Sequence, residues 1–219
     1  MAYRRTPKIE ERMASRRMAI IQAVRRVAAE VGFRDAQITR IAAAAGVATG
    51  TVYLYFQSKT ELFSEAVKVN TQHEYEIVRA AAEREAPPLP RLAAAISTFA
   101  IRAVRARRLA YAMMAEPVDI EVEQTRLDYG KAFAALFRSC IDEGIALGEL
   151  PEQDSAAAAA CVFGALVEGL IGPLAPDASH ETEETELVRT ILRFCLRAVG
   201  ATEPAVQQAI QSVLPEIRN

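Results

Sequence analysis

Small and hydrogen-bonding side chains gather between residues 41 and 63 of this 219-residue chain, in the stretch IAAAAGVATGTVYLYFQSKTELF. Thr49, Gly50 and Thr51 are followed closely by Tyr53 and Tyr55. Hydroxyl groups and open backbone at the start of a short helix are suited to hydrogen-bond base edges in the major groove of DNA. The chemistry that these residues offer is therefore recognition of a nucleic acid.

Two short helices around a glycine turn would position these groups. Ile41, Ala42 and Ala45 place small apolar side chains on one helix face, and Gly46 supplies the left-handed turn that a Cβ would penalise. We therefore expect a helix that begins near Ile38 and ends at Ala45. This order is typical of a helix-turn-helix.

The second short helix and the one after it are also marked in the sequence. Val52 and Phe56 lie four residues apart, on the face that packs inward. Ser58, Lys59 and Glu61 belong to the segment SKTE, which reads as a capping box at the start of a third helix. Exposed amides and Lys59 make that start a predicted phosphate anchor.

These motifs resemble a known family. Residues from about 17 to 63 are similar to the DNA-binding domain of the tetracycline-repressor (TetR) family, because IA, AGV, GTVYLYF and SKTELF follow in the family's order after an amphipathic helix over residues 20–31. The resemblance implies base and phosphate contacts in this region. We assign DNA contacts to Thr39, Arg40, Thr49, Gly50, Thr51, Tyr53, Tyr55 and Lys59.

Two positions depart from the family pattern. Gln37 stands where the family usually has threonine, and Ala48 where it usually has serine. Both short helices therefore lack the preferred N-cap hydroxyl, although Thr49 can substitute at the second.

The charge is divided unevenly along the chain. Residues 1–60 hold 11 basic and 4 acidic residues, a net charge of +7, whereas the remainder carries −9. A positive unit on a negative body confines attraction for the phosphate backbone to one end of the molecule. The alternative is a merely solvated basic tail. The basic start, residues 1–15, is expected to be a disordered arm that either enters a minor groove or hangs free.

Beyond residue 63 the pattern is helical throughout, with proline or glycine at the breaks. We expect the helix capped at Ser58 to continue over residues 65–85, followed by helices over residues 91–107, 120–144 and 156–172. Asp154 or Ser155 is the expected cap of the last of these, and a final strong helix is expected around residues 187–199. The predicted fold is all-α, with an N-terminal three-helix helix-turn-helix domain over residues 16–62 and a C-terminal helical ligand-binding and dimerisation domain over residues 63–219.

The last two expected helices are unusually apolar, which suits a four-helix bundle between two copies of the chain. A two-fold dimer would also read two DNA half-sites about 34–36 Å apart. The resemblance points to the same helices. We assign the dimer interface to Phe163, Val167, Leu170, Leu187, Ile191 and Phe194. The alternative is that both helices pack inside the monomer.

Large aromatic and flexible apolar side chains in the middle helices suit the lining of a ligand cavity. The resemblance implies a small-molecule effector that shifts the helix beginning at Lys59 and releases the operator. We assign ligand contacts to Phe99, Tyr111, Met113, Met114, Tyr129, Phe133, Phe137 and Phe163. An ordinary packed core is the alternative for each. The polar residues Arg107, Arg108, Glu116 and Asp119 either orient a ligand or face water.

An enzyme is disfavoured by the residues present. Cys140, Cys161 and Cys195 lie in apolar stripes, which predicts inert buried thiols, and their spacing gives no zinc signature. His73 and His180 have no metal-ligand or nucleophile spacing, and we expect no catalytic residue, metal or cofactor.

These observations together predict a cytoplasmic, homodimeric transcription regulator that binds double-stranded operator DNA, most simply a repressor released by a small apolar or amphipathic effector. No secretory signal is visible, and the longest apolar run, residues 156–174, contains Glu168 and glycines, so we expect no membrane role. A helical protein-interaction scaffold is the alternative. It would need neither the charge division nor the capped GTVYLYFQSK turn.

Overall fold

The computed structural model describes residues 7–178 and 183–218, apart from the side chains of Pro7 and residues 214–218. Its described residues form helices and no strands, which confirms the predicted all-α fold. The helices are α1 (Pro7–Asp35), α2 (Ile38–Ala45), α3 (Thr49–Tyr55), α4 (Lys59–Ala82), α5 (Pro88–Arg105), α6 (Arg107–Met114), α7 (Ile120–Ala146), α8 (Ser155–Leu174), α9 (Glu184–Ala198) and α10 (Glu203–Arg218).

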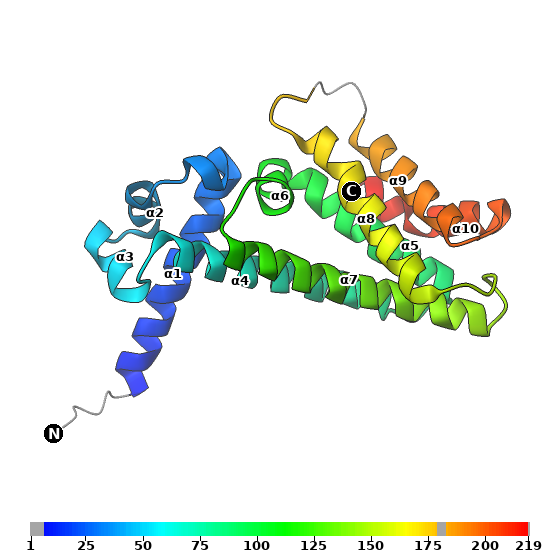
Figure 1. Cartoon of the computed structure of the whole chain (residues 1–219), viewed down its shortest axis with the longest axis horizontal. Helices are drawn as coiled ribbons and strands as arrows, with labels where there is room; N and C mark the ends of the chain where they lie inside the picture. The colour runs from blue at the N-terminus through cyan, green and yellow to red at the C-terminus, as the bar shows by residue number, and fades with distance from the viewer. Residues whose placement is uncertain (1–6, 179–182, 219) are drawn as a thin grey trace.

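Helices α1 to α3 and the first turns of α4 form an N-terminal unit at one end of an elongated molecule (Figure 1). Its core joins Ile20 and Val24 of α1, Ile41 of α2, Val52 of α3 and Leu62 of α4, each at most 1% exposed. The apolar stripes read from the sequence therefore meet as expected, because a single helix can bury its apolar face only against another element.

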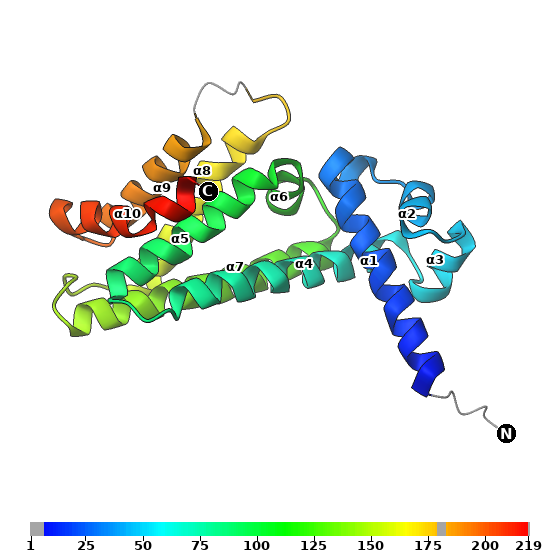
Figure 2. The same cartoon turned by 180° about the vertical axis from the view of Figure 1, so that it is seen from behind.

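The remaining helices form the body, where α4 and α7 run side by side beneath α5, α6 and α8 (Figures 1 and 2). Its core is separate from that of the N-terminal unit and reaches from Val78 on α4 to Val213 on α10. Helix α4 supplies residues to both cores, from Leu62 to Val78. The predicted domain boundary at residue 62 thus falls inside one continuous helix.

Two expectations about helix limits were wrong. Residues 7–15 are part of α1 rather than a disordered arm; residues 1–6 lie outside the described part of the chain. A tenth helix, α10, follows the one that we took as last. Its buried residues Val206, Ile210 and Val213 have helical spacing, so the sequence did carry the signal.

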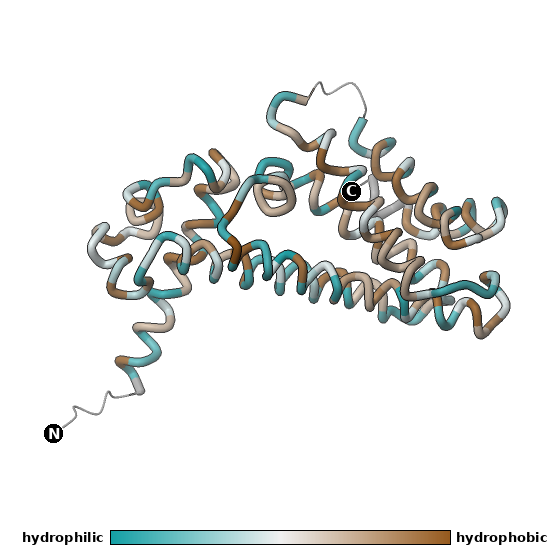
Figure 3. The backbone as a smooth tube through the Cα atoms, viewed as in Figure 1, coloured by the Kyte–Doolittle hydropathy of each residue, from teal (hydrophilic) through white to brown (hydrophobic). Residues whose placement is uncertain are grey.

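Helix α8 has an apolar face that the chain itself leaves uncovered. Its tube is coloured white to brown over most of its length (Figure 3). By length and composition it is the one helix among the described residues that could cross a membrane, and only 28% of its most apolar window is buried. The exposed positions include Ala157, Ala160, Cys161 and Gly164. Cys161 was expected to be buried, but it lies on this open face.

Candidate DNA-binding face and effector cavity

The glycine turn between α2 and α3 is confirmed. Gly46 adopts the left-handed conformation, with φ 68° and ψ 34°, and its amide donates to Ala43 at 3.1 Å. Val47 donates to the carbonyl of Ala42 at 3.0 Å, which closes the turn. Val52 and Phe56 both point inward, each 1% exposed. The turn thus fixes the direction in which α3 leaves the core.

The outer face of α3 carries Tyr53, which is 52% exposed, and Gly50, around which nothing lies within 4 Å of a built Cβ. Thr49 and Thr51 are half-buried at the start of the helix. Leu54, which is not among the assigned DNA contacts, is the most exposed large hydrophobic side chain of this helix at 81%. An apolar side chain held open in this way is available to contact a thymine methyl group.

Two of the other assigned DNA contacts, Tyr55 and Arg40, already contact groups of the protein. Tyr55 is half-buried and packs against the core of the N-terminal unit. Thr39 and Arg40 are exposed on α2, but the Arg40 guanidinium is paired with Glu30 of α1 at 2.5 Å. As the sequence indicated, neither Gln37 nor Ala48 makes a side-chain cap.

The start of α4 is capped as predicted. The Ser58 hydroxyl oxygen accepts from the Glu61 amide at 3.0 Å, and the Glu61 carboxylate accepts from the Gln57 amide at 2.6 Å. Lys59 is exposed, and its ammonium lies 5.1 Å from the centre of the Phe63 ring. This helix start therefore offers a positive charge beside partly positive amide groups.

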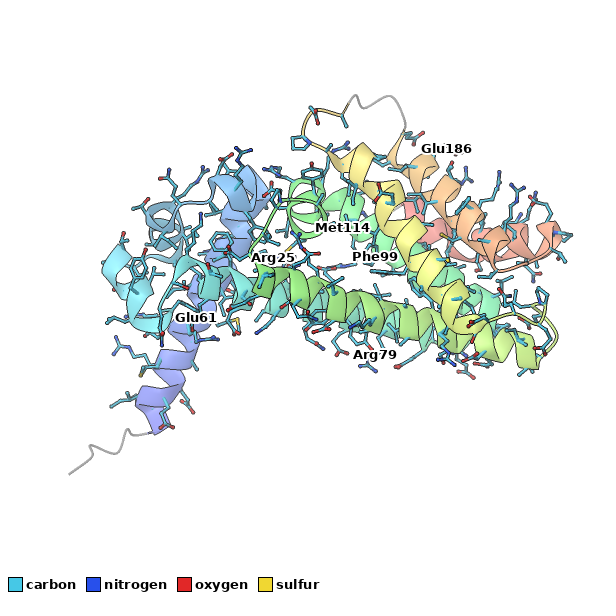
Figure 4. All side chains as sticks on the ribbon, in the orientation of Figure 1. Arg25, Glu61, Arg79, Phe99, Met114 and Glu186 are labelled. Carbon is cyan, nitrogen blue, oxygen red and sulfur yellow. The ribbon has the colours of Figure 1, made fainter. Side chains whose placement is uncertain are left out.

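A cavity of about 190 Å³ lies in the body, among α4, α5, α6, α7 and α8. Its rings pack closely, because Phe133 lies 5.2 Å from Phe99 and stacks on Phe163 at 5.6 Å. Figure 4 shows Phe99 and Met114, two of its lining residues, between the upper helices and α7. Six of the eight assigned ligand contacts line the cavity, namely Phe99, Met113, Met114, Tyr129, Phe133 and Phe163.

The other two assigned residues do not line it. Phe137 is fully buried in the body core, 6.3 Å from the Phe163 ring, and Tyr111 packs against the same core from α6. Phe137 is therefore buried and Tyr111 half-buried, and both pack against the core rather than line the cavity.

Polar groups in the cavity wall were not foreseen. Arg102 and Glu74 form a two-pronged ion pair there, with one N–O distance of 2.9 Å. Among the described residues, the Asn70 Oδ1 and Arg126 Nε atoms are buried without a hydrogen-bond partner. Burial lowers the pKa of Arg126, while Glu123 acts in the opposite direction. An unpartnered buried donor is costly, so this wall favours a ligand that brings an acceptor.

Two of the four polar residues that we expected to orient a ligand or face water, Arg108 and Glu116, instead join the two parts of the molecule. Glu116 is 6% exposed and accepts from the amides of Phe33 at 2.7 Å and Arg34 at 3.2 Å, and it pairs with Arg108. Arg108 also donates to the carbonyl of Val31 at 2.8 Å. We call these contacts the joint.

Two residues near the joint, Asp119 and Arg126, connect it to the start of α4 and to the cavity wall. Asp119 accepts from the Thr60 hydroxyl at 2.7 Å, which ties the start of α7 to the start of α4. Arg126 of the cavity wall donates to the main-chain oxygens of Glu116 at 2.9 Å and Ala112 at 2.8 Å. A continuous set of hydrogen bonds therefore runs from the cavity to the end of α1. Arg107 donates to the carbonyl of Pro173 on α8.

The assigned interface residues are distributed between different environments. Leu170 and Ile191 are buried inside the chain, and Phe163 and Val167 line the cavity, so these four offer little outer surface. Leu187 is half-buried, and Phe194 is 60% exposed. The exposed apolar area on α8 and α9 comes from Phe194 and the small residues of α8 instead, beside charged residues such as Glu168 and Arg193.

Two of the three cysteines, Cys140 and Cys195, lie buried in the body core. Burial raises the pKa of Cys195 to about 12 and also raises the pKa of Cys140, which keeps both thiols protonated. Within the described residues, no group of three His, Cys, Asp or Glu side chains is placed to hold a metal ion.

Known proteins resemble this chain in sequence and fold. The family model for bacterial regulatory proteins of the tetR family matches residues 20–66. The fatty acid metabolism regulator protein of Bacillus subtilis (strain 168) is 30% identical over 154 residues, 69% of this chain and 79% of that protein. The HTH-type transcriptional repressor BepR of Brucella suis biovar 1 (strain 1330) is 29% identical over 170 residues, 72% of this chain and 79% of that protein.

The likeness extends to a solved structure. The crystal structure of the transcriptional regulator FadR from Bacillus subtilis in complex with stearoyl-CoA matches with a TM-score of 0.71 at 26% identity, over 83% of this chain and 98% of that chain. The similarity therefore covers the body as well as the N-terminal unit.

Proposed function

Because the chain belongs to the TetR family of bacterial regulatory proteins and is a DNA-binding transcriptional regulator, we propose that it is a dimeric repressor released from its operator by a long-chain acyl ligand. The observation that carries this proposal is the course of α4. One helix begins with the capped phosphate anchor at Lys59 and continues to Asn70, Glu74 and Val78 in the cavity wall. A ligand in the cavity thus touches the same helix whose first residue follows the recognition helix by a short connection, residues 56–58.

The operator contacts that we propose centre on the outer face of α3. Tyr53, Leu54 and Gly50 are the open positions for base and backbone contacts, with Thr49 and Thr51 at the helix start. Thr39, Lys59 and, once released from Glu30, Arg40 would contact phosphates. Tyr55 would support α3 from behind.

An acyl chain suits the cavity, whose wall is mostly aromatic and aliphatic. The unpartnered Arg126 Nε atom suits a carbonyl or carboxylate oxygen at the end of such a chain. The relative of known structure was solved with stearoyl-CoA, which has both features. The cavity of about 190 Å³ is smaller than the roughly 300–1,000 Å³ of most ligand pockets, so a long chain must push its walls apart.

Movement of the cavity wall would be transmitted to the N-terminal unit through helix α6. Helix α6 carries Met113 and Met114 in the cavity wall and leads within two residues into Glu116 of the joint. Displacing α6 or Arg126 would therefore shift the end of α1, and displacing α4 would shift the anchor at Lys59. Release follows if the ligand binds better to the shifted arrangement than to the operator-bound one.

A dimer is supported by the uncovered face of α8 and α9. The small residues Ala157, Ala160 and Gly164 permit close approach of a second copy, and Phe194 offers apolar area beside them. Two copies would present two α3 helices to successive major grooves.

The proposal is tested by mobility-shift assays with the operator, identified first by genomic footprinting of the bound sites. Adding stearoyl-CoA is expected to lower operator affinity at least about tenfold, because a smaller change would not empty the site. An operator complex that is insensitive to both stearoyl-CoA and stearate would refute the ligand assignment.

A further inference from the structure

A second hollow, about 610 Å³ in volume, lies between α1 and the junction of α5 with α6, and its wall is strongly basic. Five guanidinium groups line it, from Arg25, Arg26, Arg105, Arg107 and Arg108. The described residues that line this basic groove include no carboxylate. Like charges held this close repel one another unless an anion lies among them.

The five arginines differ in the hydrogen bonds and ion pairs that they make within the protein. Arg108 is committed to Glu116 and Val31, Arg107 to Pro173, and Arg26 donates to the carbonyl of Ala44 at 2.7 Å. These contacts hold three of the five guanidinium groups in the wall.

The remaining two are available. Arg105 is exposed and makes no hydrogen bond or ion pair with any described residue. Arg25 is exposed as well, and its one ion pair, with Glu74, is long at 4.0 Å. Helix α6 also begins at Arg107, so the partly positive end of an eight-residue helix forms part of the same wall.

The basic groove adjoins the apolar cavity. Ala106 and Leu109 line both hollows. Glu74 connects them from the other side, since its carboxylate pairs with Arg102 in the cavity wall and lies 4.0 Å from Arg25 in the groove wall. One molecule with an apolar chain and an anionic end could therefore occupy both.

The groove is placed away from the recognition helix. Helix α6 lies on one side of α1, and α2 and α3 lie on the other, in both views (Figures 1 and 2). Arg25 is accordingly labelled at the junction between α1 and the body, apart from α3 (Figure 4). This position favours a ligand over the phosphate backbone of the operator.

We propose that the basic groove binds the phosphate-bearing head group of the effector, with Arg25 and Arg105 as its main contacts, while the acyl chain fills the apolar cavity. This inference rests on the proposed function and adds a second subsite to it. Guanidinium groups match phosphate oxygens in charge and geometry. A head group bound there would touch α1 directly, so both domains would hold the same molecule.

The test compares stearoyl-CoA, stearate and free coenzyme A as ligands of the full-length protein by isothermal titration calorimetry. The variants are Arg105→Gln, Arg25→Gln and the double variant. Arg138→Gln is the control, because Arg138 is exposed on α7, away from the groove, and pairs with Asp142 one turn along the same helix. Each groove variant is expected to weaken stearoyl-CoA about tenfold or more, and to weaken coenzyme A as well, since each removes a charge-assisted contact. Stearate affinity should not change. The control should leave all three affinities as they are.

The outcomes separate the two ideas. If the groove variants bind stearoyl-CoA as tightly as the unaltered protein does, the groove assignment is refuted while the acyl cavity stands. If the unaltered protein binds neither stearoyl-CoA nor stearate, the proposed function fails and the inference fails with it. If the variants lose operator affinity without any change in stearoyl-CoA binding, the groove belongs to DNA phosphate and the inference is overturned.

Discussion

Gly32 is the residue on which the joint depends most closely. It interrupts α1 with φ 79° and ψ 176°, a conformation that other residues rarely adopt. A Cβ built on it would lie 2.0 Å from the Arg108 Nη2 atom and 2.2 Å from the Glu116 Oε1 atom. Only glycine therefore lets the end of α1 approach the buried ion pair.

We expect Gly32→Ala to lower the free energy of unfolding by about 2–3 kcal/mol or more, because backbone strain adds to the loss of the buried pair. Chemical denaturation measures this directly. Gly46→Ala is the matched control. Gly46 also has a positive φ, but nothing lies within 4 Å of its Cβ position, so strain alone should cost about 1–2 kcal/mol. Equal losses at the two glycines would show that Arg108 and Glu116 do not need this close approach.

Tyr53 tests the orientation of α3. Its side chain is 52% exposed and contributes nothing to the buried core, so Tyr53→Ala should leave stability within about 0.5 kcal/mol. If Tyr53 contacts the operator, affinity should fall by about 1–3 kcal/mol, which a mobility-shift titration would detect. Unchanged affinity would mean that another face of α3 meets the DNA. The Tyr53→Phe variant keeps the ring and removes the hydroxyl, so comparing it with Tyr53→Ala separates the contributions of the two groups to operator affinity.

At the scale of the element, the same residues at the start of α4 cap the helix and position the predicted phosphate anchor, Lys59. Ser58 and Glu61 satisfy amides that would otherwise lack partners, and they hold the helix end that presents Lys59. Removing the cap therefore affects helix stability as well as the predicted phosphate anchor.

Ser58→Ala is expected to destabilise the protein by about 1 kcal/mol through loss of the N-cap hydrogen bond. Thermal unfolding followed by circular dichroism provides the measurement. Ser139 lies exposed within α7, and Ser139→Ala should be neutral or slightly stabilising because alanine is the better helix former. A similar loss at both serines would contradict the role of the cap.

At the scale of the whole molecule, the uncovered face of α8 is the surface that a second copy would cover. The face that includes Ala157, Ala160 and Gly164 is apolar, small and exposed within one chain. Nothing lies within 4 Å of a Cβ built on Gly164, so a larger side chain there fits the isolated protomer. The same side chain would occupy the space that a second copy needs.

Gly164→Glu is therefore expected to give a folded monomer at micromolar concentration, with operator affinity reduced at least about tenfold because only one half-site is read. Sedimentation velocity and mobility shifts report the two effects. Ala135→Glu, an exposed change on α7, should leave both unaltered. A Gly164→Glu protein that still sediments as a dimer would place the interface elsewhere.

Much of the N-terminal unit is determined by the sequence alone. The Gly46 turn, the inward Val52 and Phe56 and the Ser58 cap depend on neighbours within a few residues, so their geometry follows from local sterics and hydrogen bonding. Helix α10 was equally readable from the spacing of Val206, Ile210 and Val213.

Only the tertiary structure decided which apolar residues of the body pack into the core and which line the cavity. Periodicity indicates that Phe137 and Phe163 are buried, but not that one meets core and the other a cavity, because that depends on which helices pack together. The joint brings Gly32 of α1 to Glu116 in the connection between α6 and α7, and the basic groove brings Arg25 of α1 to Arg105 at the end of α5. Such contacts arise only when α1 packs against α6, and no local pattern in either helix encodes that pairing.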